Sequence, residues 1–406
     1  MPAQAELYRE VEARLQGVVA GGVRVTTVRR LALLVSGLVA AKSSVVGRMA
    51  CGLWEAGVSV AQVASIARRL RRSLNDAKLT ATACYEPAVR TMVDWEGLRR
   101  RGKPAILALD ESSQDERVHL LRVSLTYWGT AVPLAWEIWP QNTPLAEGEY
   151  WRRIELVLDR AAALVPAGLV VILTADRAFD IPPFVDRVAE RGWHWVIRLK
   201  AEGANRFLDW HGREHELRAL IHRHVAAPGR RWKTRGRIFK GAGWRAASIV
   251  AVWAPGAQER LVVITDLPPR WEVLAHYDRR FWIEAGFRAD KTGGWQWEAC
   301  QVADLEHHAR LLVAMAWATL LMLCLGLTSA RADLARLAAA RTAPPKPQHA
   351  RASLFTLGLA LARRWLARTE VPPVRWLLLN PSSTAWNTRW RRAQALRYLF
   401  SQTVRP

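Results

Sequence analysis

The stretch PAILALD, residues 104–110, is an apolar run of strand length that ends in a carboxylate. Residues 120–128 and 131–138 are two further runs of strand length, without a carboxylate at the end. The Gly129-Thr130 step between them is typical of a tight turn, so the pair predicts a β-hairpin. The chain is therefore expected to change from helices to strands near residue 104.

Helical and extended patterns alternate after the hairpin. Residues 147–164 have helical periodicity, and residues 168–175 form a fourth strand-like run, which is apolar and ends at Asp176. Residues 181–191 predict another helix and residues 193–199 a fifth strand. The order β-β-β-α-β-α-β is typical of an α/β layered core, in which antiparallel hairpins lead into strand–helix units.

Composition and patterning divide the chain into five parts. Apolar positions recur at helical spacing before residue 100, and a long helix is predicted from about Trp271 to Lys291. Between Arg230 and Arg245 there are seven basic residues and no acidic one. We expect a helical, DNA-binding N-terminal region at 1–100, the first part of the core at 101–205, a basic β-rich insertion at 206–269, the second part of the core at 270–340, and a linker with a basic helical tail at 341–406.

The overall charge favours a polyanionic partner. The chain has 59 Lys and Arg against 36 Asp and Glu, a net charge of +23. Such an excess lowers the free energy of approaching nucleic acid or an anionic membrane. The alternative is a soluble protein with a general preference for arginine.

One helix concentrates this charge in the N-terminal region. Residues 58–74 have helical spacing, and four arginines lie near the C-terminal end of this segment: Arg68, Arg69, Arg71 and Arg72. Two interpretations remain open, because such a helix either reads DNA or presents a solvated face whose cations suit the helix C-terminus.

Neither a membrane nor an oxidising compartment is indicated. The apolar stretch 311–327 is at the short limit for a span, so a buried core helix is expected. The four cysteines have no CxxC spacing and the N-terminus has no apolar signal segment. These features predict a cytoplasmic protein without a zinc site or disulfide framework.

Asp110 and Asp176 are the first candidate site residues. Each follows an apolar strand, at the end where α/β sheets place their sites. A single acid there is commonly a cap or turn residue, but two ionised carboxylates side by side repel each other. A divalent cation removes that repulsion, and two such ions can activate a water and stabilise the leaving oxygen of a phosphodiester. An oxygen-only ligand set favours Mg2+, with Mn2+ as a substitute.

The segment YDRRFWIEAGFRADK, residues 277–291, supplies the third candidate. At about 100° per residue, five of its side chains share one helix face: Tyr277, Arg280, Glu284, Arg288 and Lys291. An ordinary surface stripe of i,i+4 pairs would have the same spacing. As a catalytic face, it would offer Glu284 as a third metal ligand, with cations that hold phosphates beside it.

This segment resembles the Tyr-x2-Arg-x3-Glu-x6-Lys signature of the DDE transposases of bacterial insertion sequences. Residues 109–112 and 175–179 resemble the two Asp motifs of that family, residues 196–200 its following strand, and residues 29–43 its N-terminal helical region. The resemblance covers roughly residues 25–330. It implies an RNase H-like core that a β-rich insertion interrupts before the catalytic Glu helix.

The resemblance departs at one position. Several relatives excise DNA through a hairpin intermediate, and in them a Trp of the insertion stacks on a flipped base. Leu261 stands where that Trp would be, and Trp244 and Trp253 are the nearby substitutes. The sequence alone therefore leaves open whether excision proceeds through a hairpin or by another route.

The sequence thus predicts a DNA transposase of the nucleoid that cleaves the ends of an insertion sequence and transfers the strands to target DNA. Double-stranded DNA is the expected partner, and a homodimer is expected on DNA. Two rivals remain: an RNase H-fold nuclease without strand transfer, and a DNA-binding derivative that has lost catalysis. The expected metal ligands are Asp110, Asp176 and Glu284, and the expected DNA contacts are Tyr277, Arg280, Arg288, Lys291, Arg230, Arg231, Lys233, Arg235 and Arg237.

Overall fold

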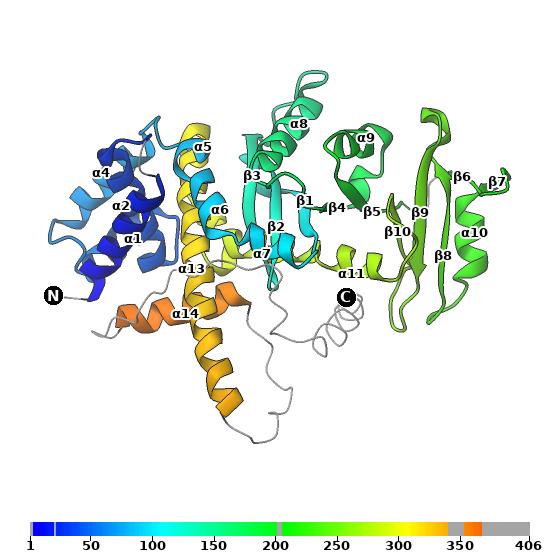
Figure 1. Ribbon diagram of the computed structural model, residues 1–406. Helices are drawn as coiled ribbons and strands as arrows, with labels where there is room; N and C mark the ends of the chain where they lie inside the picture. Colours follow the sequence, from blue (N-terminus) through cyan, green and yellow to red (C-terminus); the bar gives the residue numbers. More distant parts are fainter. Residues whose placement is uncertain (1–2, 20–21, 201–204, 340–352, 368–406) are drawn as a thin grey trace.

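The computed structural model describes residues 3–19, 22–200, 205–339 and 353–367 (Figure 1). It has one ten-stranded mixed sheet with helices packed around it, so the chain is an α/β protein. In Figure 1 the N-terminal helices lie at one end of the molecule and the strands of the insertion at the other. The strands are β1 (Ala105–Gln114), β2 (Val118–Tyr127), β3 (Thr130–Pro140), β4 (Val171–Ala175), β5 (His194–Arg198), β6 (Arg206–Leu208), β7 (Glu214–Glu216), β8 (Arg231–Ile238), β9 (Arg245–Val252) and β10 (Leu261–Thr265).

Seven helices precede β1 in the described residues. The change from helix to strand lies between the last of them and Ala105, close to the expected point. These helices are α1 (Ala3–Val19), α2 (Val25–Ala41), α3 (Val46–Glu55), α4 (Val63–Leu74), α5 (Ala81–Cys84), α6 (Glu86–Met92) and α7 (Trp95–Arg100).

The predicted element order is present in the first half of the sheet. Strands β1 to β5 are joined by α8 (Glu149–Ala162) between β3 and β4 and by α9 (Pro182–Glu190) between β4 and β5. Their spatial order is β3-β2-β1-β4-β5, with β1, β2 and β3 antiparallel and β1, β4 and β5 parallel. The hairpin and the strand–helix units therefore meet along β1.

Strand β1 is longer than its apolar run. Asp110 was expected at the end of the strand, but β1 continues to Gln114. The reason is that β1 has two partners. Its parallel pairing with β4 ends at Leu109↔Ala175, whereas its antiparallel pairing with β2 continues from Asp110↔Arg122 to the end of the strand.

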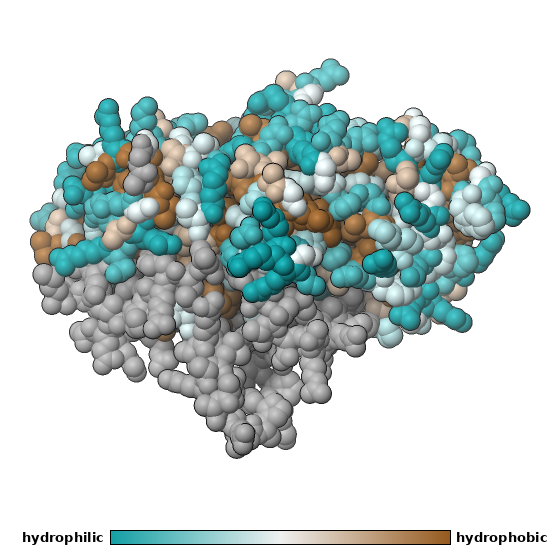
Figure 2. Space-filling view, in the orientation of Figure 1, coloured by the Kyte–Doolittle hydropathy of each residue, from teal (hydrophilic) through white to brown (hydrophobic). Residues whose placement is uncertain are grey.

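The insertion extends the same sheet instead of forming a separate one. Its last strand, β10, pairs antiparallel with β5, and β9, β8, β6 and β7 follow outward. Helix α10 (Leu217–His224) packs beside these strands. Hydrophilic side chains gather over this end of the molecule (Figure 2).

The strand register connects the two halves of the sheet. Paired residues point to the same face and alternate residues share a face. One unbroken row of partners therefore crosses the sheet: Ala108, Thr174, Val196, Thr265, Ser248 and Arg235. Asp110 and the alternate residues Arg231, Lys233 and Arg237 lie on this face too.

The long helix expected from Trp271 to Lys291 is divided into three helical segments. They are α11 (Glu272–Asp278), α12 (Phe281–Arg288) and a π-helical turn at Ala289–Gly293. Between the first two, the amides of Arg280 and Ile283 bond to carbonyls three residues earlier, so the turn is tighter than an α-helix. The helical direction continues because Arg279 and Arg280 keep right-handed dihedral angles.

The apolar stretch 311–327 lies in α13 (Leu305–Ala339) and is buried, as expected for a core helix. Within the described part of the chain, Leu305–Thr328 is long and apolar enough to cross a membrane, and 94% of its most apolar window is buried inside the protein. Helix α14 (Leu354–Ala367) packs against α13. The expected linker at 341–350 and most of the basic tail lie outside the described residues.

Candidate active site

The side chain of Arg280 joins two of the predicted carboxylates. Its Nη1 donates to Oδ2 of Asp110 at 2.9 Å, and its Nη2 donates to Oε1 of Glu284 at 2.6 Å. Asp110 is 170 residues from Arg280 in the sequence, so the contact depends on the packing of α12 over β1. A single buried guanidinium thus holds Asp110 and Glu284 together.

Asp176 lies next to this pair at the end of β4. It directly follows Ala175, the last residue that pairs with β1, and its backbone is still extended. Its Oδ1 is buried and has no hydrogen-bond partner among the residues that the structure describes. Burial raises the pKa of Asp110 to about 6, Arg280 opposes this shift, and the charges of Glu284 and Asp176 add to it. The three carboxylates therefore act on one another electrostatically.

Tyr277 and Arg280 point into the protein. The side chain of Tyr277 is fully buried, and burial raises its pKa to about 12. Arg280 is 5% exposed; burial alone would lower its pKa, but Tyr277 and the neighbouring carboxylates raise it, so it stays charged. Both residues were expected to contact DNA. In this structure neither has an exposed surface for it, because Tyr277 packs in an apolar cluster over the sheet and Arg280 is bonded to Asp110 and Glu284.

An open cleft of about 300 Å³ lies over the Asp110–Glu284 pair. Arg288 is exposed on its wall, and Lys291 is half-buried with its Nζ 3.6 Å from Glu298. The cleft therefore combines carboxylates with the two cations that the sequence placed on the same helix face. Its lining consists of Asp110, Glu111, Ser112, Glu284, Phe287, Arg288, Lys291, Thr292 and Glu298.

A cluster around Glu111 was not predicted. Tyr150 donates its hydroxyl to Glu111 at 2.5 Å, and Nε2 of His119 lies 3.2 Å from the same carboxylate. Burial alone would raise the pKa of Glu111, but these two contacts lower it, so Glu111 stays ionised beside Asp110. The residues come from β1, β2 and α8, and no local sequence pattern links them.

The aromatic substitutes considered in the insertion are partly engaged. Trp253 donates its indole N–H to the carbonyl of Ala257, and the guanidinium of Arg260 lies 4.2 Å from its ring centroid. Trp244 has a positive φ of 58° beside the β8–β9 turn. Leu261 begins β10 and is half-buried. Both tryptophans are partly buried.

The chemistry of the donor set suits a divalent cation. It consists of carboxylates alone, and one of their oxygens is buried without a partner. Arg280 fills the position between Asp110 and Glu284, and among the described residues no three His, Cys, Asp or Glu side chains already surround a metal position. In this structure the three carboxylates are therefore not gathered around one metal position.

Comparison with known proteins points to one enzyme class. Residues 151–321, less than half of the chain, match the family model of the transposase DDE domain, and this range includes Asp176 and Glu284. No curated protein matches the sequence. Among solved structures, the chain is similar to the cryo-EM structure of the piggyBac transposase synaptic complex with hairpin DNA, with a TM-score of 0.42 and 11% identity, over 99% of this chain and 83% of that one.

A TM-score this low does not establish a shared fold. The family match, however, supports a transposase of the DDE type.

The raised pKa of Asp110 predicts a pH-dependent contribution to stability. A carboxyl whose pKa rises from 3.8 to about 6 on folding binds more protons in the folded state, so its contribution falls as the pH rises through this window. Urea unfolding should show wild type losing roughly 2–3 kcal/mol relative to Asp110→Asn between pH 4 and pH 7. The control is Asp115→Asn, an exposed acid of the same strand–turn region. Parallel pH profiles for wild type and Asp110→Asn would contradict the prediction.

Proposed function

We propose that the chain is a DNA transposase that cleaves DNA ends and joins the released 3′ ends to target DNA. The observation that carries the proposal is the convergence of Asp110 and Glu284 on Arg280, beside Asp176 with its unpaired oxygen. The family match covers two of these carboxylates. The strand order β3-β2-β1-β4-β5 supports the expected RNase H-like core, with the insertion placed before the Glu284 helix.

Asp110, Asp176 and Glu284 would hold two divalent ions, with Mg2+ preferred and Mn2+ as a substitute. When bound, such ions activate a water or a DNA 3′-hydroxyl and stabilise the leaving oxygen of the phosphodiester. Until then, Arg280 offsets part of the negative charge of Asp110 and Glu284, because two buried carboxylates without a cation would repel each other. Arg280 therefore keeps the site folded and anionic.

Arg288 and Lys291 would position the DNA backbone. Both line the cleft together with Asp110 and Glu284, and both present donors toward an anionic ligand. Since phosphate contacts fix the position of the strand without reading its sequence, they would place the scissile bond over the carboxylates. The pairing of Lys291 with Glu298 is long, at 3.6 Å, and would be exchanged for a phosphate.

Strand β8 would hold the flanking DNA. Four of its cations are exposed on alternate positions, and among the described residues no carboxylate pairs with them. They lie on the sheet face of Asp110, and alternate residues of a strand are about 6.6 Å apart, close to two steps of the roughly 3.4 Å axial phosphate spacing of one DNA strand. The cations are Arg231, Lys233, Arg235 and Arg237, and Arg230 is exposed just before them.

We also propose that the enzyme acts as a homodimer on DNA, in the nucleoid, because two inverted ends match a pair of equivalent subunits. The part of the tail beyond residue 367 that was expected to join the subunits lies outside the described residues. No hairpin step is proposed, because Trp253 is covered by Arg260.

The carboxylates should be needed for chemistry and not for binding. Asp110→Asn, Asp176→Asn and Glu284→Gln should each reduce cleavage and strand transfer to background, while the Kd for DNA changes less than about tenfold, or about 1.4 kcal/mol. The substrate is an end-labelled duplex that carries the DNA flanking the gene, assayed with Mg2+ or Mn2+. Cleavage without joining by wild type would favour a nuclease, and full activity of any variant would overturn the site.

The β8 cations should set the salt dependence of DNA binding. Replacing Arg231, Lys233, Arg235 and Arg237 by Gln should reduce the slope of log affinity against log salt by about 0.9 for each lost phosphate contact, roughly 3 to 4 in total. The matched control replaces four exposed cations that directly precede β1 by Gln. They are Arg99, Arg100, Arg101 and Lys103. Equal slopes for the two quadruple variants would show that β8 is only a solvated face.

A further inference from the structure

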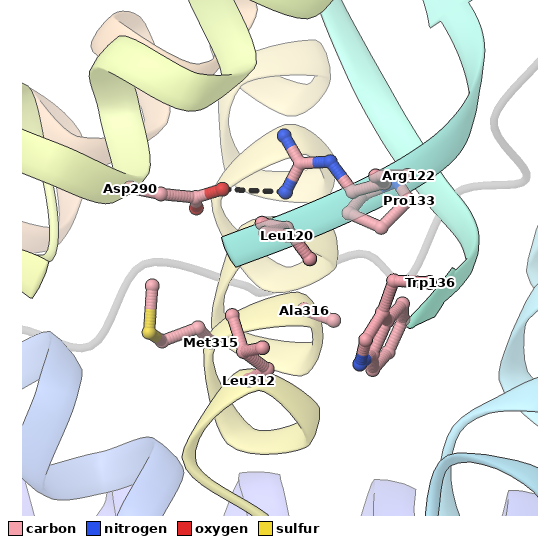
Figure 3. A pocket seen from close by; sticks show the side chains of 8 residues that line it. All are labelled: Leu120, Arg122, Pro133, Trp136, Asp290, Leu312, Met315 and Ala316. Carbon is pink, nitrogen blue, oxygen red and sulfur yellow. Dashed lines mark hydrogen bonds and ion pairs between the residues drawn. The ribbon is translucent and has the colours of Figure 1, made fainter. Parts of the chain in front are cut away.

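A buried ion pair joins the sheet to the helical segment that carries Glu284. Arg122 of β2 is 3% exposed and Asp290 is 5% exposed. Nη1 of Arg122 donates to Oδ2 of Asp290 at 2.5 Å, between Leu120, Trp136 and helix α13 (Figure 3). Neither residue lines the open cleft, and within the described chain no hydrogen bond or ion pair joins them to Asp110, Asp176 or Glu284.

Arg122 contacts more than one turn of this segment. Its guanidinium lies 4.3 Å from the ring centroid of Phe287. A Cβ at Gly286 would lie 3.2 Å from its Nη2, so the helix can approach this closely because residue 286 has no side chain. Arg122 therefore contacts residues 286 and 287 of α12 and residue 290 of the turn that follows it.

The two buried arginines form reciprocal pairs between sheet and helix. Asp110 and Arg122 are direct partners in the β1–β2 register. Asp110 of the sheet pairs with Arg280 of the helical segment, and Arg122 of the sheet pairs with Asp290 of the same segment. Glu284 lies between positions 280 and 290, so the segment is held to one place in the sheet at both ends.

The two pairs differ in what metal binding would do to them. The contacts of Arg280 are with the carboxylates that the proposed function assigns to the metal, so they would be lost when the ions bind. The contact of Arg122 with Asp290 would persist. A buried ion pair is in general no better for stability than apolar residues of similar volume, so stability alone does not explain this one.

We propose that Arg122 and Asp290 are positioning residues, which hold Glu284 at the separation from Asp110 and Asp176 that metal binding requires once Arg280 is displaced. This inference rests on the proposed function. Residues behind metal ligands that fix their orientation commonly change metal affinity by about 10–100-fold. The pair should therefore affect metal affinity more than folding.

The experiment measures Mn2+ binding to the full chain without DNA, from the loss of the free Mn2+ signal in electron paramagnetic resonance. The variant is Arg122→Met with Asp290→Leu, which removes both charges and leaves neither one buried and unpaired. We expect a thermal unfolding midpoint equal to that of wild type or higher, with a Mn2+ Kd raised about 10-fold or more. The single variant Arg122→Lys, which keeps the charge pair, should bind Mn2+ more tightly than the double variant and less tightly than wild type.

The matched control is the pair Arg30–Asp76 in the N-terminal helices. Arg30 donates to Asp76 at 2.8 Å, and Asp76 is 7% exposed, so a similar buried carboxylate is tested far from the cleft. Arg30→Met with Asp76→Asn should leave the Mn2+ Kd unchanged, whatever it does to the unfolding midpoint. An equal Kd in wild type and the Arg122–Asp290 double variant would overturn the inference. The proposed function would instead be overturned if wild type did not bind Mn2+, or if Glu284→Gln bound Mn2+ as tightly as wild type.

Discussion

The parallel pairing of β1 with β4 is the constraint on which the candidate site depends. Five residue pairs, from Ala105↔Val171 to Leu109↔Ala175, fix the two strands, and an aspartate follows the last partner on each. Paired strands lie about 4.8 Å apart, so Asp110, within β1, and Asp176, just after β4, lie side by side. The unfavourable repulsion between them follows from the backbone register, and the rest of the site compensates for it.

That compensation is concentrated on one helical segment. Of the charged side chains buried in the described residues, Asp278, Arg280 and Asp290 lie on this segment and Arg122 packs against it. Burial without a partner is costly for any charge, and burial raises the pKa of Asp278 to about 7. Packing this segment against the sheet therefore has an unfavourable desolvation free energy. The ion pairs with Asp110 and Arg122 fix its position on the sheet.

The local patterns of the sequence predicted the first five strands, their connecting helices and the buried helix at 311–327. They also selected Asp110, Asp176 and Glu284, because strand ends and helix faces are visible in periodicity. They did not show that β1 continues past Asp110, since this depends on its pairing with β2.

Helical spacing placed Tyr277 and Arg280 on the face of Glu284, but spacing alone does not say which part of a face points inward. Long-range contacts were equally hidden from the sequence. Arg122 and Asp290 are 168 residues apart, and the pairing of β10 with β5 has no local signal. Contacts of this kind depend on packing and strand register, which a single sequence does not encode locally.

Because the insertion continues the main sheet, the face on which its side chains lie depends on the register of each strand with the next. Side chains alternate along a strand, so a change of pairing by one residue moves a whole row to the opposite face. A single deletion within β9 or β10 would thus move the arginines of β8 behind the sheet, without changing the net charge or the composition. A change of length in this chain is accordingly tolerable in the β9–β10 loop, around residues 254–260, and not within the strands themselves.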